Sequence, residues 1–164
     1  MTDMLEHVTA VLQGALSLPD ASLVLHRSGL LVEMKTDLLE DKLSRYEEDG
    51  HVSWQIGAFA GHHCHVDLGI IERVVFDAEA VPCQSGRANF TVWFETSDSS
   101  GNPYRPTGYF SVTLNAPYDA DGRAHAHIVA AMRDLSVTHQ VRPNVEVTDS
   151  FRLGLAALGF PTQT

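Results

Sequence analysis

The sequence is poor in cysteine, in basic residues and in long apolar runs. Its 164 residues include two cysteines, too few for a disulfide framework and without the spacing of a zinc motif. It has 11 lysines and arginines against 21 acidic residues, and this net charge of −10 argues against nucleic-acid binding. No run approaches the roughly 20 apolar residues of a membrane span, and the acidic N-terminus does not resemble a signal peptide. We therefore expect a cytoplasmic protein without membrane insertion.

The first fifty residues are predicted to form a helix and a hairpin. Apolar residues recur at helical spacing over 3–17, and Pro19 lies just beyond. Residues 22–26 and 30–34 flank a short glycine-containing turn, which is typical of a β-hairpin. The acidic stretch 37–49 has a weak apolar pattern, which predicts a short surface helix or a solvated loop.

The middle of the chain changes to a period of two, which is the pattern of half-buried strands. Consecutive strands with short links predict an antiparallel sheet, and helical spacing then returns near the C-terminus. A final helix is expected from Asp149, capped by Thr148 and ending at Gly159. The expected strands cover residues 52–58, 63–70, 71–76, 89–95 and 109–114, and the expected helices lie around residues 128–135 and 149–158.

Three of the nine histidines lie within four positions of the segment GHHCHVDLGIIER, residues 61–73. If this segment is a strand, alternate side chains point to opposite faces. One face then carries two histidines and an acid, so it is the polar face. The expected polar face holds His63, His65 and Asp67, and the opposite face holds His62, Cys64 and Val66.

Several interpretations of these histidines remain open from the residues alone. The spacing His63-x-His65-x-Asp67 is similar to the HxHxDH motif of the metallo-β-lactamase superfamily, although Leu68 stands where its last histidine would be. Such a site would make the protein a metal-dependent hydrolase. A second metal site could use His62, His63, Cys64 and His65, but adjacent strand residues point apart. The imidazoles could also simply face water.

A further possibility is haem ligation. A neutral imidazole can occupy an axial position on iron, apolar walls exclude water from the porphyrin, and arginines pair with its propionates. Candidate wall residues include Trp54, and candidate propionate partners include Arg73. The alternative for Trp54 is packing in the core or on the sheet surface, and the alternative for Arg73 is a solvated surface position.

The segment LVLHRSGLLVEMKTDLLE followed by HVSWQIGAFAGHHCHVDLGIIERVVF resembles the ChuX/HutX cytosolic haem-utilisation carriers, whose domain is related to the repeats of HemS-type proteins. The triplet Ile71-Glu72-Arg73 and the segments 90–97 and 108–115 fall at corresponding places. The resemblance covers roughly residues 4–136. Residues 137–164 form a C-terminal extension without a clear counterpart in the family.

The resemblance implies a HemS/ChuX-like fold, a homodimer, and reversible haem binding rather than catalysis. It also implies an axial histidine from the region 51–65, with arginine at the propionates. We accordingly expect residues 1–164 to form a single α+β domain, a twisted antiparallel β-sheet with helices packed on it. Two other functions stay open: a fold-sharing interaction or small-ligand module without haem, and the hydrolase. The expected haem-binding residues are His51, His62, His63, His65, Arg73 and Trp54.

Overall fold

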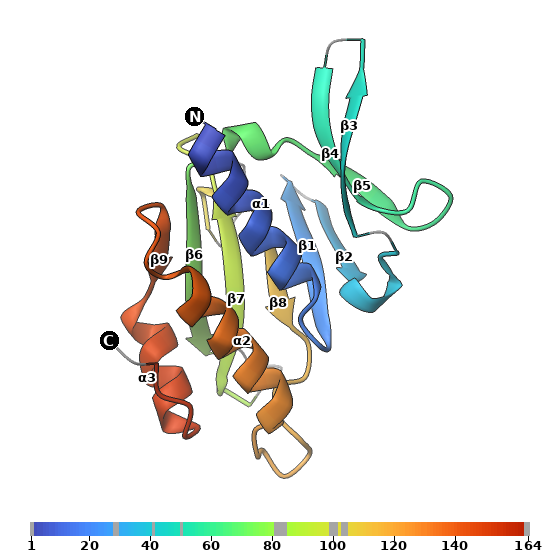
Figure 1. Cartoon of the computed structure of the whole chain (residues 1–164). Coiled ribbons are helices and arrows are strands. Elements are labelled where there is room, and N and C mark those ends of the chain that lie inside the picture. Colours follow the sequence, from blue (N-terminus) through green and yellow to red (C-terminus); the bar gives the residue numbers. More distant parts are fainter. Residues whose placement is uncertain are drawn as a thin grey trace.

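A computed structural model describes residues 2–27, 30–40, 42–49, 51–80, 85–98, 102 and 105–162 (Figure 1). None of the helices in these ranges combines the length and the apolar character that crossing a bilayer requires. The elements are α1 (Thr2–Leu16), β1 (Ala21–Arg27), β2 (Leu30–Lys35), η1 (Thr36–Leu38), β3 (Leu43–Glu48), β4 (His51–Gly57), β5 (His63–Val66), η2 (Leu68–Ile70), β6 (Arg73–Ala80), β7 (Ala88–Glu95), β8 (Gly108–Leu114), α2 (Ala126–His139), β9 (Val145–Val147) and α3 (Asp149–Ala157).

The strands form two sheets rather than the one that the sequence predicted. The large sheet has the order β2-β1-β8-β7-β6-β9, and the small sheet has the order β3-β4-β5. All neighbours are antiparallel except β6 and β9, which run parallel. The structure confirms a single α+β domain. The second sheet arises because β4 pairs only with β3 and β5. The remaining strands, including β6, form the large sheet.

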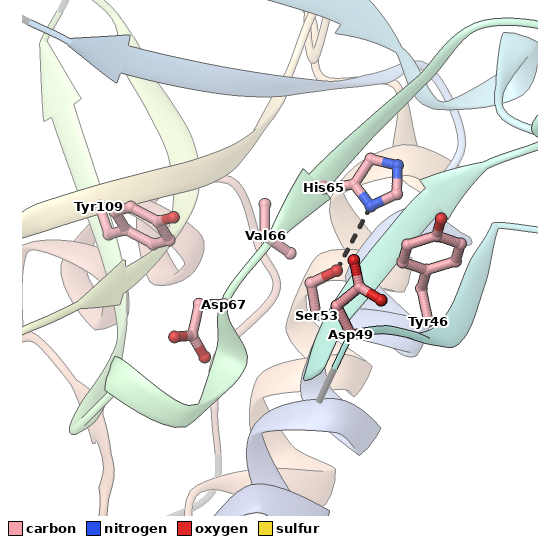
Figure 2. Close-up of a pocket in the computed structure, with 7 residues that line it drawn as sticks. All are labelled: Tyr46, Asp49, Ser53, His65, Val66, Asp67 and Tyr109. Carbon is pink, nitrogen blue, oxygen red and sulfur yellow. Dashed lines mark hydrogen bonds between the residues drawn. The ribbon is translucent and has the colours of Figure 1, made fainter. Parts of the chain in front are cut away.

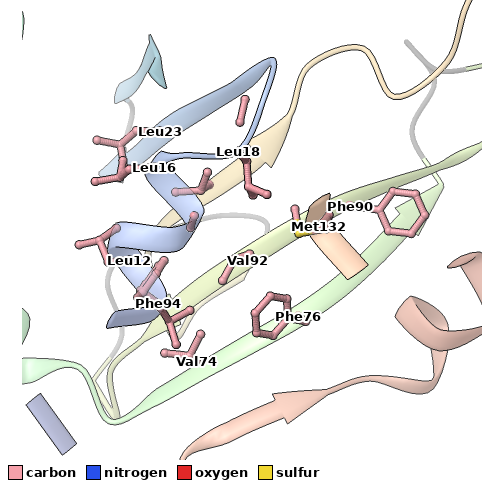
Figure 3. Packing of buried hydrophobic residues seen from close by; sticks show 14 of the residues in the cluster. Leu12, Leu16, Leu18, Leu23, Val74, Phe76, Phe90, Val92, Phe94 and Met132 are labelled. Carbon is pink, nitrogen blue, oxygen red and sulfur yellow. The ribbon is translucent and has the colours of Figure 1, made fainter. Parts of the chain in front are cut away.

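The hydrophobic core lies between the large sheet and helices α1 and α2, which cover one of its faces (Figure 1). The alternation that predicted β7 and β8 is confirmed: Phe94 and Phe110 are fully buried on this face and stack with ring centroids 4.5 Å apart. The two helices approach closely at Gly14, where any Cβ atom would collide with the side chain of Leu135. Figure 3 shows α1 side chains such as Leu12 meeting these strands.

The acidic stretch 37–49 contains a strand that the sequence did not predict. The helix or loop expected there is wrong for residues 43–48, which form β3 and pair with β4 along its whole length. β3 is an edge strand, and most of its described side chains are exposed or half-buried. An edge strand facing water has little hydrophobic alternation to reveal it.

The C-terminal residues are part of the same fold. The structure places β9 beside β6 as a parallel edge strand, and α3 packs against β6. Phe151 of α3 is fully buried and meets Phe76 and Phe90 edge to face, at centroid distances of 5.7 and 5.6 Å. Thr148 caps α3 by accepting a hydrogen bond from the Phe151 amide, as predicted.

Asp77 on β6 links this C-terminal segment to the opposite face of the large sheet. Its Oδ1 accepts hydrogen bonds from the hydroxyls of Thr148 and Ser150, both at 2.7 Å, and its Oδ2 pairs with Arg105 at 2.7 Å. Partial burial acts to raise the pKa of Asp77, but the hydrogen bonds from Ser150, Thr148 and Arg105 outweigh it and hold the pKa below its ordinary value. Arg105 also pairs with the buried carboxylate of Glu95.

We expect this arrangement to make stability sensitive to acid. A lowered folded-state pKa gives a stabilisation that is complete above the unfolded pKa of about 3.9 and lost as the pH falls through the folded value. An Asp77→Asn variant cannot titrate, so its free energy of unfolding should fall less steeply below about pH 4 than that of the wild type. Urea unfolding across this range measures the two slopes, and equal slopes would contradict the role of Asp77.

Candidate ligand-binding site

Two imidazoles share the outer face of the small sheet. β5 pairs antiparallel with β4, and the side chains of β5 alternate between the two faces of the sheet. Cys64 and Val66 belong to the inner face, where they join the hydrophobic core. His63 and His65 therefore lie together on the outer face, as the alternation in the sequence predicted.

The turn that leads into β5 depends on Gly57. This residue has φ of +92°, and the carbonyl oxygen of His62 occupies the space where a side chain would begin. Only glycine adopts this conformation readily and tolerates so close an approach. The reversal brings the chain back beside β4, so that His63 lies opposite Gly57.

The two imidazoles belong to a row of four rings, which we call the ring row. It runs from Phe59 to His63, His65 and Tyr46, with successive ring centroids 5.7, 5.6 and 5.0 Å apart. Phe59 stacks on His63, whereas the other two contacts are edge to face. Phe59 is 74% exposed, so the ring row begins at the open surface. Such a row offers aromatic contact area together with two ring nitrogens that can bind a metal centre.

Each imidazole has its Nδ1 atom engaged by the protein. Nδ1 of His63 lies 3.1 Å from the carbonyl oxygen of Gly61, and Nδ1 of His65 lies 3.4 Å from Oγ of Ser53. Because a carbonyl only accepts, the first contact requires the proton of His63 on Nδ1 and leaves the lone pair on Nε2. The hydroxyl of Ser53 can donate or accept, so His65 can adopt either tautomer.

His65 also lines a cavity of about 520 Å³ between the two sheets. The small sheet supplies Tyr46 and Ser53, while Tyr109 comes from β8 on the outer face of the large sheet (Figure 2). The described lining contains two carboxylates, Asp49 and Asp67, and no lysine or arginine. This volume is within the roughly 300–1,000 Å³ of small-molecule sites. The phenol rings and the imidazole of His65 thus offer aromatic contact and a nitrogen ligand, whereas the two carboxylates would repel anionic groups.

The other residues expected at a haem site are not gathered around His65. His62 lines a separate cavity of about 660 Å³ together with Asp37 and Glu40. Trp54 lies on the inner face of the small sheet and packs against the core. His51 begins β4, but its side chain lies outside the described residues.

Arg73 lies on the large sheet, where its guanidinium pairs with Glu95 at 2.5 Å and with Glu146 at 3.1 Å. It is in register with Glu95 and, through it, with Gly108, the neighbour of Tyr109. Two strand spacings separate these positions, roughly 10 Å. Arg73 therefore lies near the end of the cavity that Tyr109 lines, but it is already engaged by two carboxylates.

The structure offers little support for the metal sites considered from the sequence. Within the described ranges, no group of three or more histidine, cysteine, aspartate or glutamate side chains is arranged to hold a metal ion. Cys64 points away from His63 and His65, so these three cannot share an ion. Asp67 uses Oδ1 to cap η2, accepting from the amide of Gly69 at 2.8 Å.

Three residues at the cavity were not predicted from the sequence: Tyr46, Ser53 and Tyr109. Tyr109 precedes Phe110 in the same strand, so alternation sends it to the face opposite the buried Phe110, and its direction could have been inferred. The sequence around Tyr109 does not indicate that its side chain faces the small sheet, because this depends on how the two sheets pack together. Tyr46 was missed because β3 itself was not predicted. Ser53 lies on β4, which was predicted, but its contact with His65 depends on the pairing of β4 with β5.

Burial of Cys64 gives a direct check on the face assignment. Burial raises the pKa of its thiol to about 11, so at about pH 8 roughly one thiol in 1,000 is ionised. In a Cys83→Ser background, we expect Cys64 to react with a disulfide reagent at least about 100-fold more slowly in the folded than in the unfolded protein. Absorbance at the wavelength of the released thiolate follows the reaction. Fast labelling of the folded protein would place Cys64 on the outer face.

The two sheets and their helices define the fold class. No protein-family model matches the sequence, and no curated protein has a significantly similar sequence. Solved structures, in contrast, show the same fold. A crystal structure of ChuX matches with a TM-score of 0.57 and 10% identity, covering 84% of this chain and 75% of that chain.

Two further structures agree with this. A protein from Erwinia carotovora matches with a TM-score of 0.59 and 15% identity, over 84% of this chain and 74% of that one. A structure described as the heme-binding protein ChuX matches with a TM-score of 0.55 and 10% identity, over 80% of this chain and 72% of that one. The chain therefore has the ChuX fold, and the fold expected from the resemblance is confirmed.

Proposed function

We propose that this protein is a haem carrier, which binds haem or a similar iron tetrapyrrole reversibly in the cavity between the two sheets. His65 supplies the axial nitrogen, and Tyr46 and Tyr109 contribute the flanking walls. The observation that carries this proposal is the position of His65, which lines the cavity and belongs to the ring row. The heme-binding neighbour of the same fold supports it. The bound iron would accept the imidazole as a ligand, and no catalytic step is needed.

The residues present fit one end of a haem and not the other. An imidazole and phenol rings match the iron and the porphyrin plane. The carboxylates of Asp49 and Asp67 would repel propionates, and the lining contains no described cation to pair with them. We therefore place the propionates at the open side of the cavity. Arg73 and Arg105, which both pair with Glu95 on the large sheet, are the arginines that we propose for the propionates.

The direct test is titration with hemin, followed by absorbance in the Soret region. We expect saturable binding of one hemin per chain with a shifted Soret band. Iron-free protoporphyrin IX should bind more weakly, because it cannot accept the imidazole. If the Soret band does not move, or if both compounds bind equally, the protein is a fold-sharing module that does not use His65 as an iron ligand.

The acidic lining makes a second prediction. Replacing Asp49 by asparagine removes a negative charge from the cavity, and its φ of +51° is one that asparagine tolerates. Weaker repulsion of the anionic ligand should tighten hemin binding by about two- to fivefold. Asp121→Asn, at an exposed residue remote from the lining, is the control and should leave the affinity unchanged. Weaker binding by the Asp49 variant would contradict the repulsive role of its charge.

The proposal includes a cytoplasmic location and a homodimer. β2 is an edge strand of the large sheet, and its Leu30 and Leu31 are 60% and 53% exposed. An apolar edge strand of this kind favours pairing with another chain. Sedimentation equilibrium should give twice the chain mass of 18.0 kDa, and a Leu31→Lys variant should shift the population towards the monomer. A monomeric wild type would contradict this part of the proposal.

A further inference from the structure

The two imidazoles on the outer face of β5 are spaced almost as two ligands of one metal ion would be. The ring centroids of His63 and His65 lie 5.6 Å apart. A zinc–nitrogen bond is about 2.0–2.1 Å long, so two imidazoles on one tetrahedral ion have ring centroids roughly 5.2 Å apart. The observed spacing exceeds this by roughly 0.4 Å, a shift that exposed or half-buried side chains can make.

The protein holds both rings by the nitrogen that such an ion would not use. Nδ1 of His63 lies 3.1 Å from the carbonyl oxygen of Gly61, and Nδ1 of His65 lies 3.4 Å from Oγ of Ser53. Histidines that bind metals usually donate their other ring N–H to a neighbouring acceptor in this way. Nε2 is then the ligand atom of each ring, provided that His65 donates its Nδ1 proton to the Ser53 hydroxyl. Figure 2 shows the other ring nitrogen of His65 turned away from Ser53.

A second pair of histidines with the same sequence spacing lacks these features. His125 and His127 lie at the start of α2, and their ring centroids are 6.2 Å apart. This exceeds the spacing on a tetrahedral ion by roughly 1 Å. The side chain of His125 also makes no capping hydrogen bond to the helix. The pair on α2 therefore serves as an internal comparison for the pair on β5.

We propose that His63 and His65 form a two-histidine site for a divalent transition-metal ion that prefers tetrahedral coordination, such as zinc. Nε2 of each imidazole is a ligand, and the other two positions take water or a ligand from solution. In the described ranges no third histidine, cysteine, aspartate or glutamate completes the site, so the ion exchanges more readily than at a closed structural zinc site. The site shares His65 with the proposed function but does not rest on it, because no hemin takes part.

Zinc titration of the full chain, followed by the ring ¹⁵N signals of the histidines, tests this site. The Nε2 signals of His63 and His65 should shift together and saturate at one ion per chain, while each Nδ1 keeps its proton. His63→Ala and His65→Ala should each lower the affinity for zinc at least about tenfold. The double variant should lose little beyond this, because either substitution alone breaks the chelate.

His127→Ala is the matched control, because it removes one member of the other pair and should leave the affinity for zinc unchanged. If zinc does not bind, or shifts only one of the two imidazoles of β5, the shared site is excluded. Equal shifts at His125 and His127 would mean an adventitious ion only, which also overturns the proposal. None of these results affects the hemin titration, so the proposed function stands or falls separately.

Discussion

His65→Ala should lower the affinity for hemin by about 100-fold, the largest functional effect that we expect from one substitution. The side chain lines the cavity and supplies the proposed axial nitrogen, so its loss removes the bond to iron. The remaining binding would come from aromatic contact and from the neighbouring His63. Hemin titration gives the affinity, and the position of the Soret band reports the change of ligand.

Rescue separates a lost ligand from a damaged fold. Free imidazole added to the His65→Ala protein should restore the wild-type spectrum, because it can occupy the space that the side chain leaves. A merely structural histidine would not be rescued in this way. His127→Ala, at an exposed position on α2, should bind hemin as the wild type does. A His65→Ala protein with unchanged affinity and spectrum would exclude His65 as the axial ligand.

Phe151→Ala should lower the free energy of unfolding by about 3–5 kcal/mol, the largest stability effect that we expect. Its ring is fully buried between Phe76 and Phe90, so truncation leaves a cavity in the main core. Urea unfolding followed by circular dichroism measures the change. The loss should appear in a single cooperative transition if residues 137–162 belong to one domain with the rest of the chain.

Leu153 on the same helix is the matched control. Its side chain is 70% exposed, and Leu153→Ala should change the free energy of unfolding by about 0.5 kcal/mol or less. Equal effects of the two substitutions would mean that burial of α3 does not stabilise the protein. A separate low-stability transition lost only in the Phe151 variant would instead make the C-terminal segment an independently melting extension.

Much of the fold could be predicted because its main elements have strong local patterns. The helices α1 and α3, the β1–β2 hairpin and the strands β4, β7 and β8 were expected close to their observed bounds. Two elements lacked such a pattern. β3 is an exposed edge strand, and β9 has three residues whose partner β6 lies about seventy positions earlier. Pairing over that distance is a property of the tertiary structure.

The candidate site was predictable in part. A period of two was sufficient to place His63 and His65 on one face and Cys64 on the other. The same rule places Trp54 on the face away from His65, because the register pairs Trp54 with Val66 and Gln55 with His65. The cavity itself could not be predicted, because Tyr109 reaches it from another sheet. The ion pairs that engage Arg73 likewise join residues distant in sequence.

The most direct test of the central claim is a crystal structure of the protein with hemin bound. We predict that the iron will lie in the cavity between the sheets, bonded to Nε2 of His65, with the porphyrin beside Tyr46 and Tyr109. Iron bonded to His62 near Asp37 and Glu40, or hemin held elsewhere on the surface, would contradict the account.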